Sequence, residues 1–153
     1  MLAIRFINFF ALLFPLGSLA AYEPEKIKQS LQANQSLYQI SGWHHDSSSN
    51  SWVANTSIKL LSINIGKDIS IVKSPHINPK QKKLAKARCL DFGTVGIAPK
   101  SDADHHQISE LVRIATQRHI PQFTDMYGVR FEVLPEMKGT YVSLICRLKP
   151  SAR

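Results

Sequence analysis

Spacing of apolar residues predicts one helix clearly, between residues 102 and 119. Its apolar positions recur at intervals of three and four, as on one face of a helix: Ile108, Leu111, Val112 and Ala115. Ser101 stands where an N-cap is expected, Asp104 can complete a capping box, and Pro121 follows the expected end. The sequence therefore predicts an amphipathic helix with a defined start and stop.

Alternation with a period of two predicts a closing pair of strands. In the segment "VRFEVL" the residues Val129, Phe131 and Val133 share one face. In "TYVSLICRL" the residues that share one face are Val142, Leu144, Cys146 and Leu148. These segments predict a C-terminal hairpin with Cys146 pointing inward.

A second hairpin is predicted between residues 57 and 74, with Gly66 at its turn. A three-residue connection at 66–68 would pair Ile65 with Ile69 and Ile63 with Ile71. The alternative, a two-residue turn at Gly66-Lys67, would pair Asn64 with Ile69 and put the isoleucines on opposite faces. We prefer the three-residue connection because a one-residue slip moves an entire apolar set to the other face of a strand.

The remaining segments complete an α+β pattern. "EPEKIKQSLQ" predicts a short helix, "SLYQISGW" a strand, and "HHDSSSNS" a polar connection. Asn78 and Pro79 predict a helix that ends near Arg88. "CLDFGTVGIAP" predicts an interrupted strand, in which Gly93 and Gly96 indicate a bend or close backbone packing. The fold class predicted is α+β, a single domain with a mainly antiparallel sheet of about five or six strands and two or three helices on one face.

The N-terminal pattern is that of an export signal. Arg5 precedes the uncharged run "FINFFALLFPLG", and Ser18-Leu19-Ala20 supplies the small residues of a cleavage site. We expect residues 1–20 to be a signal peptide and residues 21–153 to form the exported domain, either periplasmic or secreted. No later segment is long and apolar enough to predict a transmembrane helix once the signal is removed.

The chain has two cysteines, Cys89 and Cys146. An even number of cysteines in an exported chain is typical of a disulfide, and this bond would close a long loop. A nucleophilic cysteine is the alternative, but its partner would have to stay reduced outside the cytoplasm.

A basic segment of the chain indicates which kinds of partner the protein could bind. The chain carries a formal net charge of +8, which falls to +7 when Arg5 leaves with the signal. The basic residues Lys73, Lys80, Lys82, Lys83, Lys86 and Arg88 lie within a stretch that contains no acidic residue. Such a cluster indicates an anionic-partner surface, although a solvated helix face has the same pattern. The segment lacks interleaved aromatic residues, so sequence-specific nucleic-acid binding is not favoured.

Histidines and carboxylates suggest two further kinds of site. Asp102, His106 and Glu110 are spaced four apart and could present metal ligands on one helix face, opposite the apolar stripe. The alternative is that the acidic residues at 102 and 104 only stabilise the helix start, which needs no cofactor.

A secreted cationic hydrolase is an alternative, and a ribonuclease-like enzyme is one example. Such an enzyme would need a general base, a general acid and a cation. His44 or His45, Glu132, and Arg130 or Arg147 are the candidates for these roles. No Gly-x-Ser-x-Gly elbow, His-Glu-x-x-His motif or phosphate-binding loop is present.

The sequence thus favours a small exported, disulfide-stapled factor that binds a protein or an anionic partner, of the accessory or virulence type. A hydrolase and a histidine-based metal-binding protein are the alternatives. No cofactor is indicated.

Overall fold

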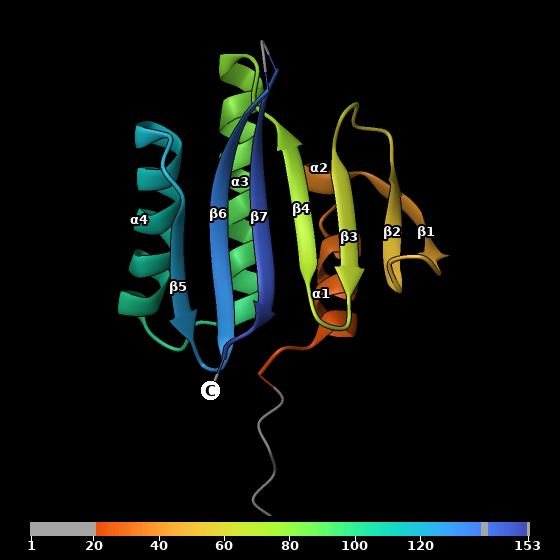
Figure 1. Ribbon diagram of the computed structural model, residues 1–153, viewed down its shortest axis with the longest axis horizontal. Helices are drawn as coiled ribbons and strands as arrows, with labels where there is room; N and C mark the ends of the chain where they lie inside the picture. The colour runs from red at the N-terminus through yellow and green to blue at the C-terminus, as the bar shows by residue number, and fades with distance from the viewer. Residues whose placement is uncertain (1–20, 139–140, 153) are drawn as a thin grey trace, which may run out of the picture.

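Seven strands form one antiparallel sheet, and the helices lie against one of its faces (Figure 1). The computed structural model describes residues 21–138 and 141–152, so the expected signal peptide lies outside the described residues. The helices are α1 (Pro24–Ala33), α2 (Gln35–Tyr38), α3 (Pro79–Ile97) and α4 (Asp102–Arg118). The strands are β1 (Ile40–Asp46), β2 (Ser51–Thr56), β3 (Ser62–Gly66), β4 (Ser70–Pro75), β5 (Gln122–Met126), β6 (Val129–Lys138) and β7 (Tyr141–Pro150).

The sheet has the strand order β1-β2-β3-β4-β7-β6-β5. Helix α3 crosses the middle strands β4, β7 and β6, while α4 covers β5 and β6 and α1 lies over β3. The core lies between the helices and the sheet, where Phe92 of α3 and Phe131 of β6 are both fully buried. This confirms an α+β fold with its helices on one face of an antiparallel sheet.

The number of elements exceeds the prediction, because the described chain has seven strands and four helices. Strand β2, with the sequence "SWVANT", was not predicted, and neither was β5, "QFTDM". Both contain many polar residues: β2 lies next to the edge strand β1, and β5 is an edge strand itself. Residues 36–38, predicted as the start of a strand, belong to the short helix α2, and the strand begins at Ile40.

The register of the β3–β4 hairpin differs from the prediction by one residue. Ile65 pairs with Ser70, and Ile63 pairs with Val72. The amide of Gly66 donates to the carbonyl of Ile69 (2.9 Å), so the turn itself is only Lys67–Asp68. Val72 faces the helices together with Ile63, whereas Ile71 lies on the opposite face of the sheet. The alternation of isoleucines in the sequence does not determine this register, because the face of each strand that is buried is the one that the helices cover.

Helix α3 continues well beyond Arg88, through the segment predicted as an interrupted strand. The buried residues of its second half recur at helical spacing: Cys89, Phe92, Gly93, Gly96 and Ile97. The two glycines lie where the helix approaches the sheet. A Cβ atom at Gly93 would stand 2.6 Å from the ring of Phe131, and one at Gly96 would stand 2.2 Å from Leu148. Close backbone packing is therefore confirmed, but between a helix and the sheet.

Helix α4 and the C-terminal hairpin agree with the sequence. Ser101 is the N-cap, and its side chain and that of Asp104 form the capping box. The predicted apolar stripe of α4 is buried, and β6 pairs with β7 along its whole length.

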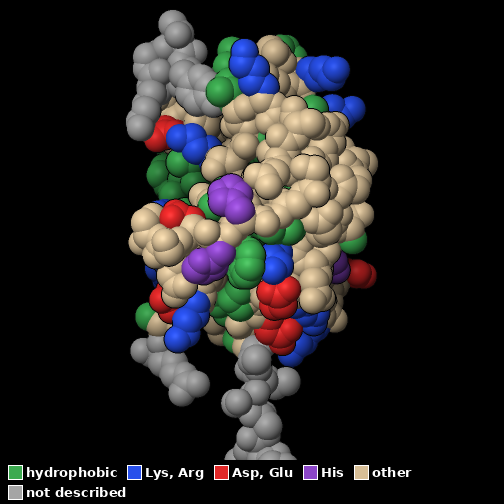
Figure 2. Space-filling model, turned by 90° about the vertical axis from the view of Figure 1, so that its right-hand side faces the viewer, with side chains coloured by type: hydrophobic (Ala, Val, Ile, Leu, Met, Phe, Trp, Pro, Cys, Tyr) green, Lys and Arg blue, Asp and Glu red, His purple; other side chains and the backbone are tan. Residues whose placement is uncertain are grey.

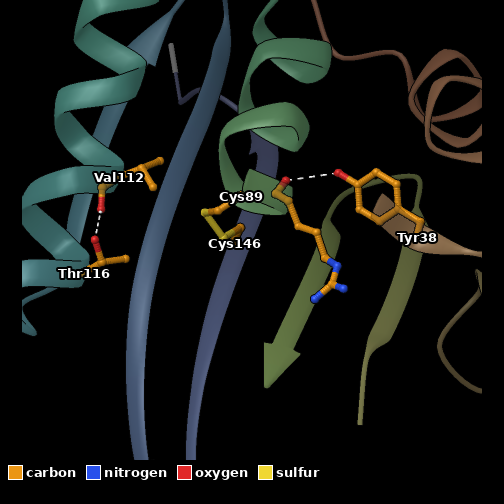
Figure 3. The surroundings of a disulfide bond; sticks show 6 residues. Tyr38, Cys89, Val112, Thr116 and Cys146 are labelled. Atoms are coloured by element: carbon orange, nitrogen blue, oxygen red, sulfur yellow. Dashed lines mark hydrogen bonds between the residues drawn. A yellow bond between two sulfur atoms is a disulfide. The ribbon is translucent and has the colours of Figure 1, made fainter. Parts of the chain in front are cut away.

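A disulfide between Cys89 of α3 and Cys146 of β7 joins the helix layer to the sheet (Figure 3). Both cysteines are buried, with Cα atoms 5.6 Å apart. Next to them the hydroxyl of Tyr38 donates to the carbonyl of Arg88 (3.0 Å) and lies 2.8 Å from a carboxylate oxygen of Asp91. These contacts fix α2 against the middle of α3.

Candidate anion-binding site

Four lysines project from the first turns of α3: Lys80, Lys82, Lys83 and Lys86. Within the described part of the chain, none of their ammonium groups has an ion-pair or hydrogen-bond partner. Figure 2 views the molecule from the β1 side and shows basic side chains gathered at its upper end, where α3 begins in Figure 1. We call this group of four lysines the α3 lysine cluster.

The start of α3 is held in place by side-chain capping. The side chain of Asn78 accepts a hydrogen bond from the amide of Gln81 (2.9 Å), and the side chain of Gln81 accepts one from the amide of Ile77 (3.0 Å). Pro79 occupies the first helical position. The positive end of the helix dipole therefore lies in the same place as the lysines and adds to their potential.

His76 lies directly before this helix start and is 7% exposed. Its backbone amide donates to the carbonyl of Val142 (2.9 Å), while neither ring nitrogen has a hydrogen-bond partner among the described residues. Burial lowers the pKa of His76, and the positive charges of Lys82, His119 and Lys86 lower it further. A buried imidazole without a partner is costly in a protein interior, so it marks a place where a ligand group could bind.

His76 lines a cavity of about 510 Å³. The other residues of its wall come from the start of α3, the end of α4 and the β6–β7 hairpin: Ile77, Asn78, Pro79, Lys82, His119, Met137 and Val142. Two histidines and a lysine thus face a single opening with an apolar rim. This combination suits an anionic group carried on an apolar body.

His119 reaches the cavity because α4 ends at Arg118. The predicted helix extended to residue 119. His119 is instead the C-cap, with φ of 55°, and its side chain is exposed. No spacing in the sequence links His119 to His76, since the two are brought together only by the packing of α4 beside α3.

Two residues of the predicted anionic-partner surface lie elsewhere. Arg88 is only 2% exposed, and its Nε donates to the carbonyl of Leu37 (2.7 Å). Lys73 lies on the sheet face away from the helices and pairs with Glu136 (2.6 Å). Among the six residues of the predicted surface, only the four of the α3 lysine cluster are therefore without such a partner in the described part of the chain.

The structure does not bring the candidate catalytic residues together. His44 and His45 are on the edge strand β1, whereas Arg130 and Glu132 are on β6, five strands away. With neighbouring strands about 4.8 Å apart, this separation is about 24 Å, too far for acid–base catalysis on one bond.

The same residues also have structural partners. Glu132 pairs with Arg147 and Lys149, both at 2.8 Å, and Arg130 pairs with Asp125 at 2.7 Å. The ring of His45 packs edge-on against Trp52, with centroids 5.2 Å apart, while His44 lies 3.2 Å from the side-chain oxygen of Asn55. These contacts give each candidate a role in the sheet.

The candidate metal ligands on α4 stand on an open surface. Asp102 and His106 are exposed, and Glu110 forms an ion pair with Arg113, whose Nε lies 2.7 Å from the carboxylate. Across residues 21–138 and 141–152, no group of three His, Cys, Asp or Glu side chains is arranged to hold a metal ion.

Comparisons with known proteins give no relative. The sequence matches no protein-family model, and searches of curated proteins and of solved structures found no match. None of the helices in the described residues has the length and apolar character needed to cross a membrane.

Proposed function

We propose that this protein is an exported, disulfide-stapled binding factor that holds an anionic partner at the α3 lysine cluster. The observation that carries the proposal is the set of unpaired lysines beside the unpartnered imidazole of His76. Basic residues on the sheet face and on α1 have carboxylate partners, for example Lys73 and Lys28. The lysine cluster has none within the described residues, and its charge is free to attract an anion.

The rest of the fold supports a binding role because it makes the cluster rigid. The helix that carries the lysines is capped at its start and bonded to the sheet by the disulfide at Cys89. Side chains held on a fixed helix lose less entropy when they meet a partner than side chains on a loop. An exported protein would keep this disulfide, which agrees with the proposed site of action.

Fluorescently labelled polyphosphate, titrated with the oxidised protein at several salt concentrations, tests the proposal. The site variant replaces Lys80, Lys82, Lys83 and Lys86 by glutamine. The control variant replaces four lysines from other parts of the surface by glutamine and so has the same net charge: Lys26, Lys28, Lys67 and Lys100.

We expect the site variant to bind at least about tenfold more weakly than the wild type at physiological salt. Its plot of log affinity against log salt should be less steep by about 3, since about 0.7 counterions are released per neutralised single-strand phosphate. The control variant should bind nearly as well as the wild type. Equal losses in both variants would show that net charge alone attracts the polyanion, and would refute a localised site.

A further inference from the structure

Exposed apolar side chains lie around the His76 cavity, which Lys82 of the cluster also lines, and they come from three separate segments. Ile77 lies between β4 and α3 and is 52% exposed, Ile120 lies between α4 and β5 and is 44% exposed, and Met137 lies near the end of β6 and is 66% exposed. Ile77 and Met137 line the His76 cavity, and Ile120 follows His119, which also lines it. We call these three residues the apolar rim.

The apolar rim has no function inside the fold. Its members lie outside the core, and each leaves a large part of an apolar side chain in water. Single exposed apolar residues are common on proteins, but a group of them beside unpaired lysines is the composition of surfaces that bind at a lipid–water boundary.

Both ends of the described chain lie away from this surface. Ala21 lies next to Gly96 and Ile97 at the other end of α3, where it lines a cavity with Tyr127. Gly96 follows Lys80 by 16 residues and Lys86 by 10 residues, so at about 1.5 Å per residue the lysine cluster lies about 15–24 Å along α3 from Ala21. Figure 1 shows the C-terminus at the same lower end. Neither end of the described chain therefore lies between the lysine cluster and a partner.

We propose that the anionic partner is a lipid bilayer surface that contains acidic headgroups. The lysine cluster contacts the headgroups, the apolar rim enters the outer part of the acyl region, and the His76 cavity accepts a headgroup phosphate. This inference rests on the proposed function and names the chemistry of its partner.

The positions of aromatic residues favour a bilayer over a single-stranded nucleic acid. Among the described residues, the lining of the cavity contains no Phe, Tyr or Trp side chain that could stack on a base. Among the exposed aromatic residues of the described chain, Trp52 lies beneath Lys28 and Phe123 lies beneath Arg130, with the cations 4.2 Å and 4.6 Å from the ring centroids. Tyr127 donates its hydroxyl to Asp104 at 2.7 Å.

Flotation with vesicles tests the proposal, using phosphatidylcholine alone or mixed with phosphatidylglycerol. Every protein has the same N-terminus, so any contribution of residues 1–20 cancels in the comparison. The rim variant carries Ile77→Ser, Ile120→Ser and Met137→Ser. Its control carries Ile69→Ser, Leu90→Ser and Tyr127→Ser, which removes exposed apolar side chains away from the upper end. Thermal unfolding of each variant verifies that it is folded.

We expect the wild type to bind the acidic vesicles at least about tenfold more tightly than the neutral ones, in keeping with several lysines near an anionic surface. The rim variant should lose about tenfold or more in vesicle binding, since three apolar side chains no longer leave water. It should keep its affinity for polyphosphate. The rim control should match the wild type in both assays.

Two outcomes separate this inference from the proposed function. If the wild type binds polyphosphate through the lysine cluster but not acidic vesicles, the lipid partner is refuted and the anion-binding function stands. If it binds neither probe, both are refuted. Vesicle binding by the rim variant at the wild-type level would overturn the insertion of the apolar rim.

Discussion

Replacing Gly93 by alanine tests the closest contact between α3 and the sheet. The added Cβ would meet two ring carbons of Phe131 at 2.6 Å, about 1 Å inside the usual carbon–carbon contact distance of about 3.5–4.0 Å. The ring belongs to a fully buried side chain in β6, a strand paired on both sides, so it has little room to move.

The magnitude follows from two opposing effects. Overpacking a well-filled core costs about 1–3 kcal/mol, and we take the upper end because an aromatic ring is rigid. Alanine gains about 1 kcal/mol over glycine in the interior of a helix. Gly93→Ala should therefore lower the free energy of unfolding by about 2 kcal/mol. For a domain of this size, the corresponding decrease in Tm is about 7 °C.

Urea and thermal unfolding of the oxidised protein measure this effect, and a double-mutant cycle identifies its cause. In a Phe131→Leu background the clash is relieved, and Gly93→Ala should become neutral or stabilising. Ser109→Ala, at an exposed position of α4, is a control that should change stability by less than about 0.5 kcal/mol. If Gly93→Ala stabilises the wild type by the full helix propensity gain, the close approach of α3 to β6 is refuted.

Four further predictions concern the rest of the fold. Replacing both Cys89 and Cys146 by alanine should lower the free energy of unfolding by about 4 kcal/mol in the chain-entropy model, and a loss below about 1 kcal/mol in urea unfolding would contradict it. Ser101→Ala removes the N-cap of α4 and should cost about 1 kcal/mol in the same assay, whereas Ser101→Gly should cost only a few tenths. The pKa of His76 is lowered from 6.5 in the folded protein, so the unfolded chain takes up a proton that the folded chain does not. Stability should therefore fall as the pH decreases below about 6.5, and less so in His76→Gln; equal slopes in the two proteins would rule out this linkage. N-terminal sequencing of exported protein should begin at Ala21, and a retained leader would argue against cleavage.

Elements with local signals could be predicted well. The capping box at Ser101 and the apolar spacing of α4 lie within consecutive residues, so they need no knowledge of distant contacts. The same is true of the alternation that predicted β6 and β7. Helix α3 was predicted too short because glycines at 93 and 96 weaken a helical pattern, although they permit its packing against the sheet.

The candidate site could be predicted only in part. The basic segment is visible in the sequence, but its buried and paired members are not, because Arg88 and Lys73 meet their partners through distant segments. His76 was not selected as a candidate, and its only local signal is its position before a basic helix. Its proximity to His119 depends on the antiparallel packing of two helices.

The sequence by itself determined the α+β class, the well-capped helix α4, the C-terminal hairpin and the pairing of its two cysteines. The first three rest on patterns among residues that are close together in the chain. The cysteine pairing follows because a chain with two cysteines offers each of them only one partner. The tertiary structure alone decided the register of β3 against β4, the extent of α3 and the convergence of three segments around His76. The physical reason is that the burial of a residue and its charge partners depend on which distant helix or strand packs against it. The local periodicity of the sequence does not change with the identity of that helix or strand.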